Sequence, residues 1–400
     1  MKILMINVVC GIRSTGRICT DLANALEEQG HQVKIAYGRE EVPEQYQKYA
    51  VRIGNDFDVK LHGLIARTFD AAGFGSKTAT KKFIKWVREY DPDVIHLHNI
   101  HGYYINIEVL FDYLRTCGKK IIWTLHDCWA FTGHSAYCDV AECGKWKNGC
   151  GHCPNMKIYP RSYIDRSRYN WKKKQTIMKG IPNLIIVTPS NWLAGLVKES
   201  FLSEYRVEVI HNGIDTSQFH PMKNDFREVY GIGDKFMLLG VATSWDNMKG
   251  LADFIQLSEK LDDSYQVVLV GVTADQKTKL PKSIIAIERT NSVRELAYIY
   301  SAADLFLNLS YCENYPTVNL EAMACNTPVL TYKTGGSPES AEGHNGIVIE
   351  RGDLSAVISA LDTYRKANGS KPDLNVDVEE FDKHTAVREY RIIFERAEDN

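Results

Sequence analysis

No segment of the 400-residue sequence contains the roughly 20 apolar residues that a membrane-spanning helix requires. The N-terminal segment MKILMINVV is a short apolar run that breaks at Cys10-Gly11. A secretory signal peptide needs a longer apolar region and a cleavage site of small residues, and neither follows. We therefore expect a cytoplasmic protein, located at most at the inner face of the plasma membrane.

Neither sign of charge dominates, because 48 Lys and Arg residues face 50 Asp and Glu residues and the formal net charge is −2. This balance gives no overall attraction to nucleic acid, so we expect no nucleic-acid partner and a local site for any anionic ligand. With 44% hydrophobic residues the chain is not of the disordered class. Its length exceeds what one core usually holds, which favours two domains.

Short apolar segments alternate with helix-length segments along the chain, as in a parallel α/β protein. The first, residues 3–9, precedes the turn GIRSTGR, a helical pattern that ends at Gly30, and the apolar segment QVKIAY. This order is typical of a βαβ unit. The later apolar segments form two series, at 94–98, 121–125, 184–189 and 207–211, and at 236–242, 266–272, 284–288, 305–310 and 328–332.

The two series predict two Rossmann-like domains that bind ligands beyond the carboxyl ends of their strands. We place the first domain at residues 1–185, with a cysteine-rich insertion at about 128–155, and the second at 186–375. Residues 376–400 carry apolar side chains at helical spacing among mixed charges, which predicts an amphipathic helix. The apolar residues are Phe381, Val387, Tyr390, Ile393 and Phe394.

The most specific feature is ENYPTVNLE at residues 313–321, directly after the apolar segment LFLNLS. Pro316 suits the first turn of a helix, where free backbone N–H groups attract a diphosphate. Glu313 and Glu321, eight positions apart, can flank a single ligand. On its own this spacing also fits two surface acids of a solvated helix.

The longer block ENYPTVNLEAMACNTPVLTYKTGGSPE closely resembles the signature of retaining glycosyltransferases of the GT4 type, which have the GT-B fold. MKILMINVV with STGRI, VIHLHN, TLHDCWAFTGH, VTPSNWLA and VIHNGID fall in that family's order, so the resemblance covers nearly the whole chain. It implies two Rossmann-like domains that face each other across a cleft, with the final helix returning to the first domain. The resemblance is strongest for the branch that builds bacterial capsular, exopolysaccharide or O-antigen chains.

Position by position, the resemblance implies a site for a UDP- or GDP-sugar donor. Glu321 would hold the ribose hydroxyls, and Glu313 would contact the transferred sugar. Lys249, in WDNMKG, would neutralise the diphosphate, and Gly16 would let the N-terminal loop approach the donor closely. His126 would face the reacting sugar from the first domain. The loop whose amides meet the diphosphate would consist of Asn314, Tyr315, Pro316 and Thr317.

One position departs from the family pattern, because Ser244 lies five residues before Lys249, where the family usually has Arg. A hydroxyl donates one hydrogen bond but lacks the charge and planar fork of a guanidinium. Either Arg17 or Arg289 substitutes, or the donor phosphate is held more weakly. The resemblance implies retention without a metal, since lysine and backbone amides can stabilise a leaving diphosphate. We expect no cofactor beyond the donor.

A histidine cluster follows one of the apolar segments. His96, His98 and His101 include a His-x-His pair that could bind zinc. We favour the interpretation that these histidines line the acceptor side of the site.

The cysteines of the insertion raise a second question of metal binding. Their gaps of four, six and two residues fit a compact structural Zn²⁺ site, and free thiols are an equal alternative. CGHC at 150–153 also matches the dithiol motif of disulfide isomerases, but no strand precedes it, so we do not expect a redox role. The candidate zinc ligands are Cys138, Cys143, Cys150 and Cys153.

These features predict a hexosyltransferase that moves a sugar from a UDP- or GDP-sugar to a glycan or lipid-linked acceptor in bacterial surface polysaccharide synthesis. Peripheral membrane association is compatible with such an acceptor. Two alternatives stay open: a nucleotide-sugar epimerase or phosphorylase of the same fold, and a non-catalytic scaffold that binds sugar nucleotides. The donor sugar, the acceptor and the oligomeric state are not determined by the sequence.

Overall fold

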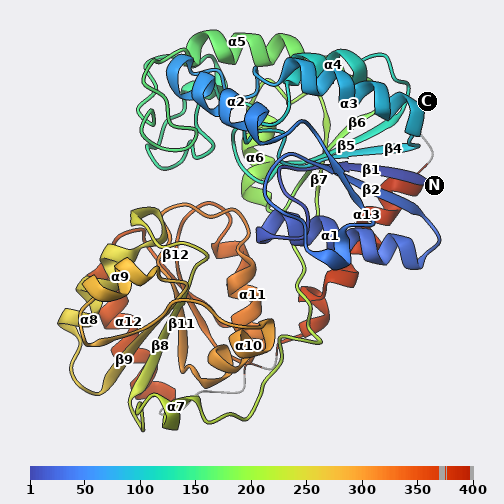
Figure 1. Ribbon diagram of the computed structural model, residues 1–400. Helices are drawn as coiled ribbons and strands as arrows, with labels where there is room; N and C mark the ends of the chain where they lie inside the picture. The colour runs from blue at the N-terminus through green and yellow to red at the C-terminus, as the bar shows by residue number, and fades with distance from the viewer. Residues whose placement is uncertain (369–373, 375, 397–400) are drawn as a thin grey trace. The chain divides into compact units, whose positions relative to one another are not determined.

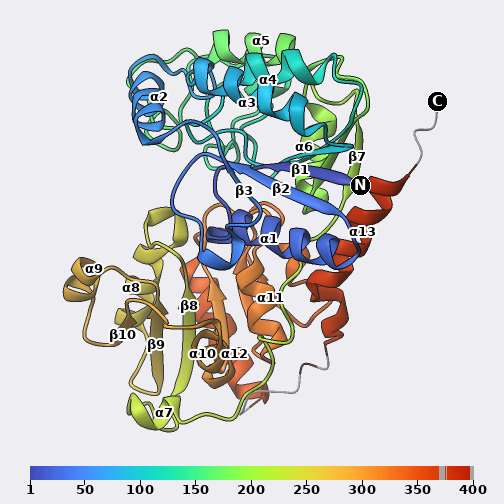
Figure 2. The ribbon, with the colours of Figure 1, turned by 45° about the vertical axis from the view of Figure 1, so that its right-hand side comes forward.

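The chain forms two compact units in a computed structural model that describes residues 1–368, 374 and 376–396 (Figures 1 and 2). Unit 1 comprises Met1–His211 together with the chain from Ala386 onward, and unit 2 comprises Asn212–Thr385. Each unit has one parallel sheet with helices on both faces (Figure 1).

The sheet of unit 1 has seven strands in the order β3-β2-β1-β4-β5-β6-β7, and all neighbouring pairs are parallel. Its central strands are apolar on both faces, because helices cover each side of the sheet. The strands are β1 (Lys2–Ile6), β2 (Gln32–Tyr37), β3 (Ala50–Arg52), β4 (Val94–Leu97), β5 (Lys120–Thr124), β6 (Leu184–Thr188) and β7 (Arg206–Val209). The helices are α1 (Arg13–Glu28), α2 (Asp56–Phe69), α3 (Lys77–Tyr90), α4 (Ile107–Leu114), α5 (Ser167–Met178), α6 (Asn191–Glu199) and α13 (Lys383–Glu395).

Unit 2 has a six-stranded parallel sheet in the order β10-β9-β8-β11-β12-β13. Its strands are β8 (Phe236–Val241), β9 (Tyr265–Val270), β10 (Ile284–Ile287), β11 (Leu305–Asn308), β12 (Val329–Tyr332) and β13 (Ile347–Ile349). Its helices are α7 (Phe226–Val229), α8 (Leu251–Lys260), α9 (Ala274–Lys279), α10 (Val293–Ala302), α11 (Thr317–Ala324) and α12 (Leu354–Asn368). Single 3₁₀ turns at Asn247–Lys249, Pro338–Ser340 and Val378–Phe381 complete it.

Both sheets reverse their direction of strand addition once, between β1 and β4 in unit 1 and between β8 and β11 in unit 2. At such a switch point the loops that follow the two central strands diverge and leave a crevice at the carboxyl edge of the sheet. The topology therefore gives each unit one preferred place for a ligand.

The division between the units falls at His211 and Asn212, later than the expected boundary at residue 185. The apolar segments at 184–189 and 207–211 form β6 and β7, which pair with the first sheet. Part of the expected second domain thus belongs to unit 1, while residues 369–373 and 375 lie outside the described residues.

The C-terminal helix returns to unit 1, as expected, but it is shorter than residues 376–400. Val387, Tyr390, Ile393 and Phe394 of α13 pack into the core formed by β1, β2 and α1. Phe381 lies in a 3₁₀ turn before the helix and packs into the core of unit 2 instead. Residues 397–400 lie outside the described residues.

Candidate active site

The switch point of unit 2 brings together a lysine and a glutamate from two different loops. Lys249 lies in the loop after β8 and Glu313 in the loop after β11, and the Lys249 ammonium donates to the Glu313 carboxylate. The side chain of Glu313 is 14% exposed and that of Lys249 is 38% exposed. Burial lowers the pKa of Lys249, but the Glu313 carboxylate raises it by more, so Lys249 is a cation.

Backbone contacts fix the relative position of these two loops. The N–H of Tyr311 donates to the carbonyl of Met248 over 2.8 Å. Gly250 has a φ of +73°, and a Cβ at this position would lie 2.2 Å from the carbonyl oxygen of Leu309. Glycine after Lys249 is therefore required for the close approach of the loop to the end of β11.

Helix α11 presents its N-terminus at the same edge. Pro316 precedes this helix in an extended conformation, and Thr317 is the first helical residue. The sequence placed Pro316 inside the first turn, so the predicted helix start was one residue too early. Pro316, at the N-cap, makes no side-chain hydrogen bond to the first turn, and the N–H groups of such a turn attract an anion. The side-chain amide of Asn212 donates to the carbonyl of Tyr315 over 3.0 Å, which holds the chain before the helix.

A buried polar network fixes the orientation of α11. The Asn319 amide donates to the hydroxyl of Ser340 over 2.8 Å, and its carbonyl oxygen accepts from Asn308 over 2.9 Å. Glu321, 7% exposed, accepts a hydrogen bond of 3.0 Å from the hydroxyl of Tyr300 on α10. Tyr300 lies outside the motifs of the sequence, and Asn319 lies inside the ENYPTVNLE motif, whose pattern does not show that its side chain bonds to Asn308 and Ser340.

The remaining expected donor residues of unit 2 lie on loops at the carboxyl ends of strands. Ser244 is exposed in the loop after β8, and Arg289 is exposed in the loop after β10. Asn314 is partly exposed between Glu313 and the buried Tyr315. No ion pair of Arg289 is found among the described residues, so its guanidinium is available to an anion.

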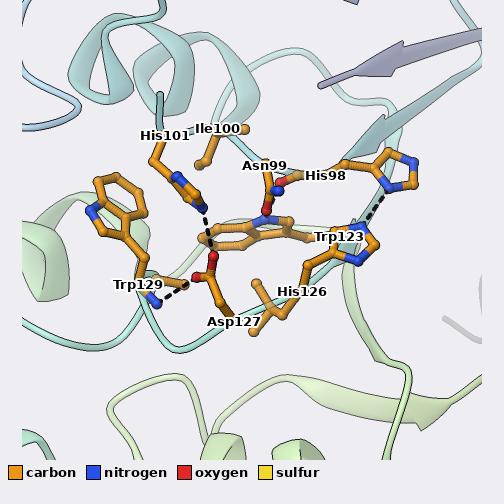
Figure 3. A pocket seen from close by; sticks show the side chains of 10 residues that line it. His98, Asn99, Ile100, His101, Trp123, His126, Asp127 and Trp129 are labelled. Carbon is orange, nitrogen blue, oxygen red and sulfur yellow. Dashed lines mark hydrogen bonds and ion pairs between the residues drawn. The ribbon is translucent and has the colours of Figure 1, made fainter. Parts of the chain in front are cut away.

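In unit 1, two hydrogen-bonded pairs lie around a small pocket at the carboxyl ends of β4 and β5, next to the switch point (Figure 3). His98 Nδ1 and His126 Nε2 are 3.0 Å apart, and His101 Nε2 and Asp127 Oδ2 are 2.8 Å apart. Trp123 lies between the two pairs (Figure 3). All four polar residues follow β4 or β5, whose carboxyl ends meet at this edge.

The pocket makes His126 a neutral group. Burial lowers the pKa of His126 to about 4, so its imidazole is uncharged at neutral pH. Burial raises the pKa of Asp127, but His101 and the Trp129 N–H lower it by more, and the carboxylate stays ionised. Sequence reasoning missed Asp127, although a carboxylate beside His126 just after an apolar segment was a detectable signal.

His96 does not line the pocket edge, contrary to expectation. It lies within β4, fully buried, and its Nε2 is 2.8 Å from the hydroxyl of Thr124, which is in turn 3.0 Å from the hydroxyl of Tyr390 on α13. His96 therefore contributes to the packing of the C-terminal helix on the sheet. His98 and His101 do lie after the strand, as predicted.

Gly16 lies in the first turns of α1 and not in the loop before it. A Cβ at this position would lie 3.0 Å from Cγ2 of Val9 and 3.2 Å from the backbone nitrogen of Gly11. The Gly11 N–H donates to the Gly16 carbonyl over 3.1 Å. Gly16 thus lets the loop after β1 fold closely onto the helix.

The spacing of the insertion's cysteines leaves two interpretations open, a four-cysteine zinc site and free thiols, and the arrangement of the cysteines agrees with free thiols. Cys138 lies beside Cys128. Burial, and to a lesser extent the neighbouring Cys138, raises the thiol pKa of Cys128 well above its ordinary value. Within residues 1–368, 374 and 376–396 no group of three or more Cys, His, Asp or Glu residues is arranged to hold a metal ion. Burial raises the pKa of Cys150 and of Cys153 to about 11, the opposite of what a reactive dithiol needs.

Aromatic packing orders the insertion. The rings of Phe131 and Trp146 are 5.0 Å apart, and Trp171 donates to the carbonyl of Trp146 over 2.8 Å. The buried ammonium of Lys174 donates to the carbonyls of Trp129 over 2.6 Å and Thr132 over 3.1 Å. Burial lowers the pKa of Lys174 to about 7.

This lysine predicts a measurable pH dependence of stability. Between pH 7 and about pH 10 the amine is protonated when unfolded and neutral when folded, so the unfolded state binds more protons and stability rises with pH. The slope for one such group is up to ~1.4 kcal/mol per pH unit. Urea unfolding at pH 7, 8 and 9, followed by tryptophan fluorescence, should show a smaller rise for Lys174→Met than for the wild type. The fluorescence reports mainly on unit 1, which contains Lys174, because six of the seven tryptophans lie there. Equal slopes for the two proteins would contradict a neutral Lys174 in the folded state.

Two Rossmann-like units, each with polar residues at the carboxyl edge of its sheet, define the GT-B class of fold. The solved structures agree. HepE of Anabaena, in complex with UDP, has a TM-score of 0.69 at 15% identity and 98% coverage of both chains. WaaG, described as a glycosyltransferase involved in lipopolysaccharide biosynthesis, has a TM-score of 0.64 at 16% identity over 99% of this chain and 100% of WaaG.

The sequence comparison gives the family. The profile of Glycosyltransferase Family 4 matches residues 15–218, more than half of the chain, and the profile of glycosyl transferases group 1 matches residues 235–365. The chain belongs to Glycosyltransferase Family 4, as its motifs predicted.

Two relatives of known name differ in how much of this chain they match. WcaC of Escherichia coli K12, provisionally assigned as a colanic acid biosynthesis glycosyl transferase, is 23% identical over 385 residues, covering 90% of this chain and 89% of WcaC. RfbU of Salmonella typhimurium LT2, an O-antigen chain mannosyltransferase, is 27% identical over 185 residues, covering 45% of this chain and 48% of RfbU.

Proposed function

We propose that this glycosyltransferase moves a hexose, with retention, from a UDP- or GDP-sugar to a glycan or lipid-linked acceptor in bacterial surface polysaccharide synthesis. The observation that carries the proposal is the Lys249–Glu313 pair beside the N-terminus of α11. The relatives support the pathway class, since WcaC and RfbU are named for colanic acid and O-antigen. HepE, of the same fold, was solved with UDP and with UDP-glucose.

In this proposal the diphosphate binds between Lys249 and the first N–H groups of α11, and Glu321 accepts hydrogen bonds from the ribose. The bond between the sugar C1 and the diphosphate oxygen breaks, an acceptor oxygen bonds to C1 on the same face, and the acceptor proton passes to the leaving phosphate. Negative charge grows on the diphosphate, so a fixed ammonium and helix-end N–H groups stabilise the transition state more than the ground state. Glu313 contacts the hydroxyls of the transferred sugar.

The neutral His126 has a different part in the proposal. An uncharged imidazole can accept and donate hydrogen bonds without repelling the positive charge that develops on the sugar ring. His98 holds the His126 ring by their 3.0 Å contact. Since the pKa of His126 is about 4, the acid side of the pH–rate profile should show no loss of activity due to this group above about pH 5.

The test is a panel of UDP- and GDP-sugars in thermal shift, followed by transfer to an acceptor with analysis of the product anomer. A donor at 100 times its Kd should stabilise the protein by about 2.7 kcal/mol. Absence of any shift across the panel would overturn the proposal. An epimer or a sugar phosphate formed without acceptor would identify the epimerase or phosphorylase alternative, and donor binding without turnover the scaffold.

We also propose that catalysis needs no metal, since lysine and amide donors act on the leaving group. Transfer measured in excess EDTA should then equal transfer in buffer alone, and added Mg²⁺ or Mn²⁺ should not raise it. A loss of activity in EDTA that Mg²⁺ restores would contradict this part of the proposal.

A further inference from the structure

Exposed apolar side chains of the described chain gather in two segments of unit 1. Among residues 1–368, 374 and 376–396 there are twelve large hydrophobic residues with high exposure, and seven of them lie in α2 or between residues 163 and 169. They are Phe57 at 71%, Leu61 at 44%, Leu64 at 63%, Phe69 at 51%, Tyr163 at 77%, Ile164 at 47% and Tyr169 at 50% exposed. Scattered single residues of this kind are ordinary, but a cluster marks an interaction surface.

One face of helix α2 is buried, and another face exposes apolar side chains. Phe57, Leu61 and Leu64 recur at i, i+4 and i+7, so they form one outward stripe. His62 and Ala66 point the other way and are buried against unit 1. A helix that only covers a core would carry polar residues on its outer face, so the outward stripe needs another explanation.

The second segment is attached to the end of this helix. The Tyr163 N–H donates to the carbonyl of Arg67 over 2.9 Å, and the Ser162 hydroxyl donates to the same oxygen over 3.0 Å. Both segments therefore form one surface, on the side of the sheet where α2 and α5 lie (Figures 1 and 2). We name it the apolar-basic surface, made of the seven apolar residues above with Lys60, Arg67, Arg161, Arg166, Arg168 and Lys172.

Positive charge predominates in the second segment of this surface, whereas α2 carries Asp56 and Asp58 in its first turn. Residues 157–173 contain six Lys or Arg residues and one acid, Asp165. The Asp165 carboxylate accepts from the backbone N–H groups of Cys153 and Ser167, over 2.7 and 2.8 Å, so it is engaged within the fold. The Arg166 guanidinium lies 4.5 Å from the Tyr169 ring centroid, which places cation and aromatic side by side. A local excess of positive charge in a chain of net charge −2 calls for an anionic partner.

We propose that the apolar-basic surface docks on the surface of an anionic lipid bilayer. Aromatic and leucine side chains enter the interfacial region while arginine and lysine contact anionic headgroups. A protein partner would need a groove that combines apolar contacts with several acidic side chains. An anionic bilayer presents apolar chains and negative headgroups over its whole surface. None of the helices in the described part of the chain is long and apolar enough to cross a membrane, so the contact is peripheral. The inference rests on the proposed function in one respect, since a lipid-linked acceptor is presented at a membrane.

The test is sedimentation of the full chain with vesicles of phosphatidylcholine alone or with about 30% phosphatidylglycerol. Each basic residue near an anionic surface adds roughly fivefold to binding. The triple variant Arg161→Gln, Arg168→Gln, Lys172→Gln should therefore lose about 100-fold in apparent affinity for the anionic vesicles. Phe57→Ser with Leu64→Ser should also weaken binding, and high salt should weaken the wild type.

Matched changes in unit 2 serve as controls. Val229→Ser with Tyr230→Ser removes two residues of similar exposure, 69% and 43%, and Lys277→Gln, Lys279→Gln, Lys282→Gln removes three exposed lysines. Neither control should alter vesicle binding. Equal binding to both vesicle types, or equal loss in the controls, would overturn the inference. The wild type could instead form a dimer and bind no vesicles, with the dimer lost in Phe57→Ser with Leu64→Ser. That result would assign the surface to a second copy of the chain and would also overturn the membrane inference.

Donor binding separates this inference from the proposed function. The surface variants should give the same thermal shift with a UDP- or GDP-sugar as the wild type, measured without vesicles. If no sugar nucleotide binds but the anionic vesicles still do, the proposed function fails and the membrane inference stands. If the donor binds and is transferred while the vesicles do not bind, only the membrane inference fails.

Discussion

Lys249→Met is expected to lower kcat about 10²- to 10³-fold, the range seen when one donor to a developing anion is removed. Methionine keeps the length of the side chain but removes the ammonium that would face the leaving diphosphate. The binding of the whole donor should change less than kcat, because the interaction strengthens as negative charge develops in the transition state. Steady-state kinetics at saturating donor measures this effect directly.

Two further variants define what the loss means. Lys260→Met changes an exposed lysine on α8 of the same unit and should leave kcat unchanged. Lys249→Arg retains the charge and should recover part of the rate. If Lys249→Met loses no more than Lys260→Met, the leaving group is stabilised by another cation, and Arg289, exposed after β10, becomes the candidate.

Glu321→Gln is expected to raise the KM for the donor by about 10- to 100-fold, with a smaller effect on kcat. A hydrogen bond to a charged acceptor contributes about 1.5–3 kcal/mol, and the ribose lies away from the reacting bond. Glutamine can still accept the hydrogen bond from Tyr300, so the fold should keep its stability. Donor titration by thermal shift and the KM-to-kcat comparison both report the change.

Glu259→Gln, on the exposed side of α8, is the matched control and should leave both constants unaltered. An equal fall in kcat and kcat/KM for Glu321→Gln would contradict a ribose-binding role and would move this carboxylate to the reacting sugar. A lowered unfolding midpoint without any change in KM would show that Glu321 serves only the packing of α10 on α11.

The positions of most strands along the chain were predictable from the sequence, since long buried strands leave continuous apolar runs. β8 and β9 illustrate this, at Phe236–Val241 and Tyr265–Val270. β3 and β13 were missed because each is a three-residue edge strand, at Ala50–Arg52 and Ile347–Ile349, too short to leave a pattern. The domain boundary was misplaced for another reason: apolar runs show that strands exist but not which sheet they join.

The candidate site was predictable where loops follow strands and not where side chains meet across elements. The motif around Glu313 led to the correct helix start within one residue. Tyr300, which bonds to Glu321, lies outside any motif, and the motif itself does not show that Asn319 bonds to Asn308 and Ser340. Spacing alone could not decide between a zinc site and free thiols, because it cannot show that Cys138 packs against Cys128. Likewise His96 was assigned to an edge although its place inside β4 buries it.

The ion pair between Lys249 and Glu313 has a consequence for selectivity, under the proposed function. With this pair formed, the lysine charge is already compensated, so inorganic phosphate or a bare nucleotide must separate Lys249 from the Glu313 carboxylate to bind there. A complete sugar nucleotide brings hydroxyl groups that can solvate the same carboxylate in the same event. The abundant small anions of a cell are thereby placed at a disadvantage against the intact donor.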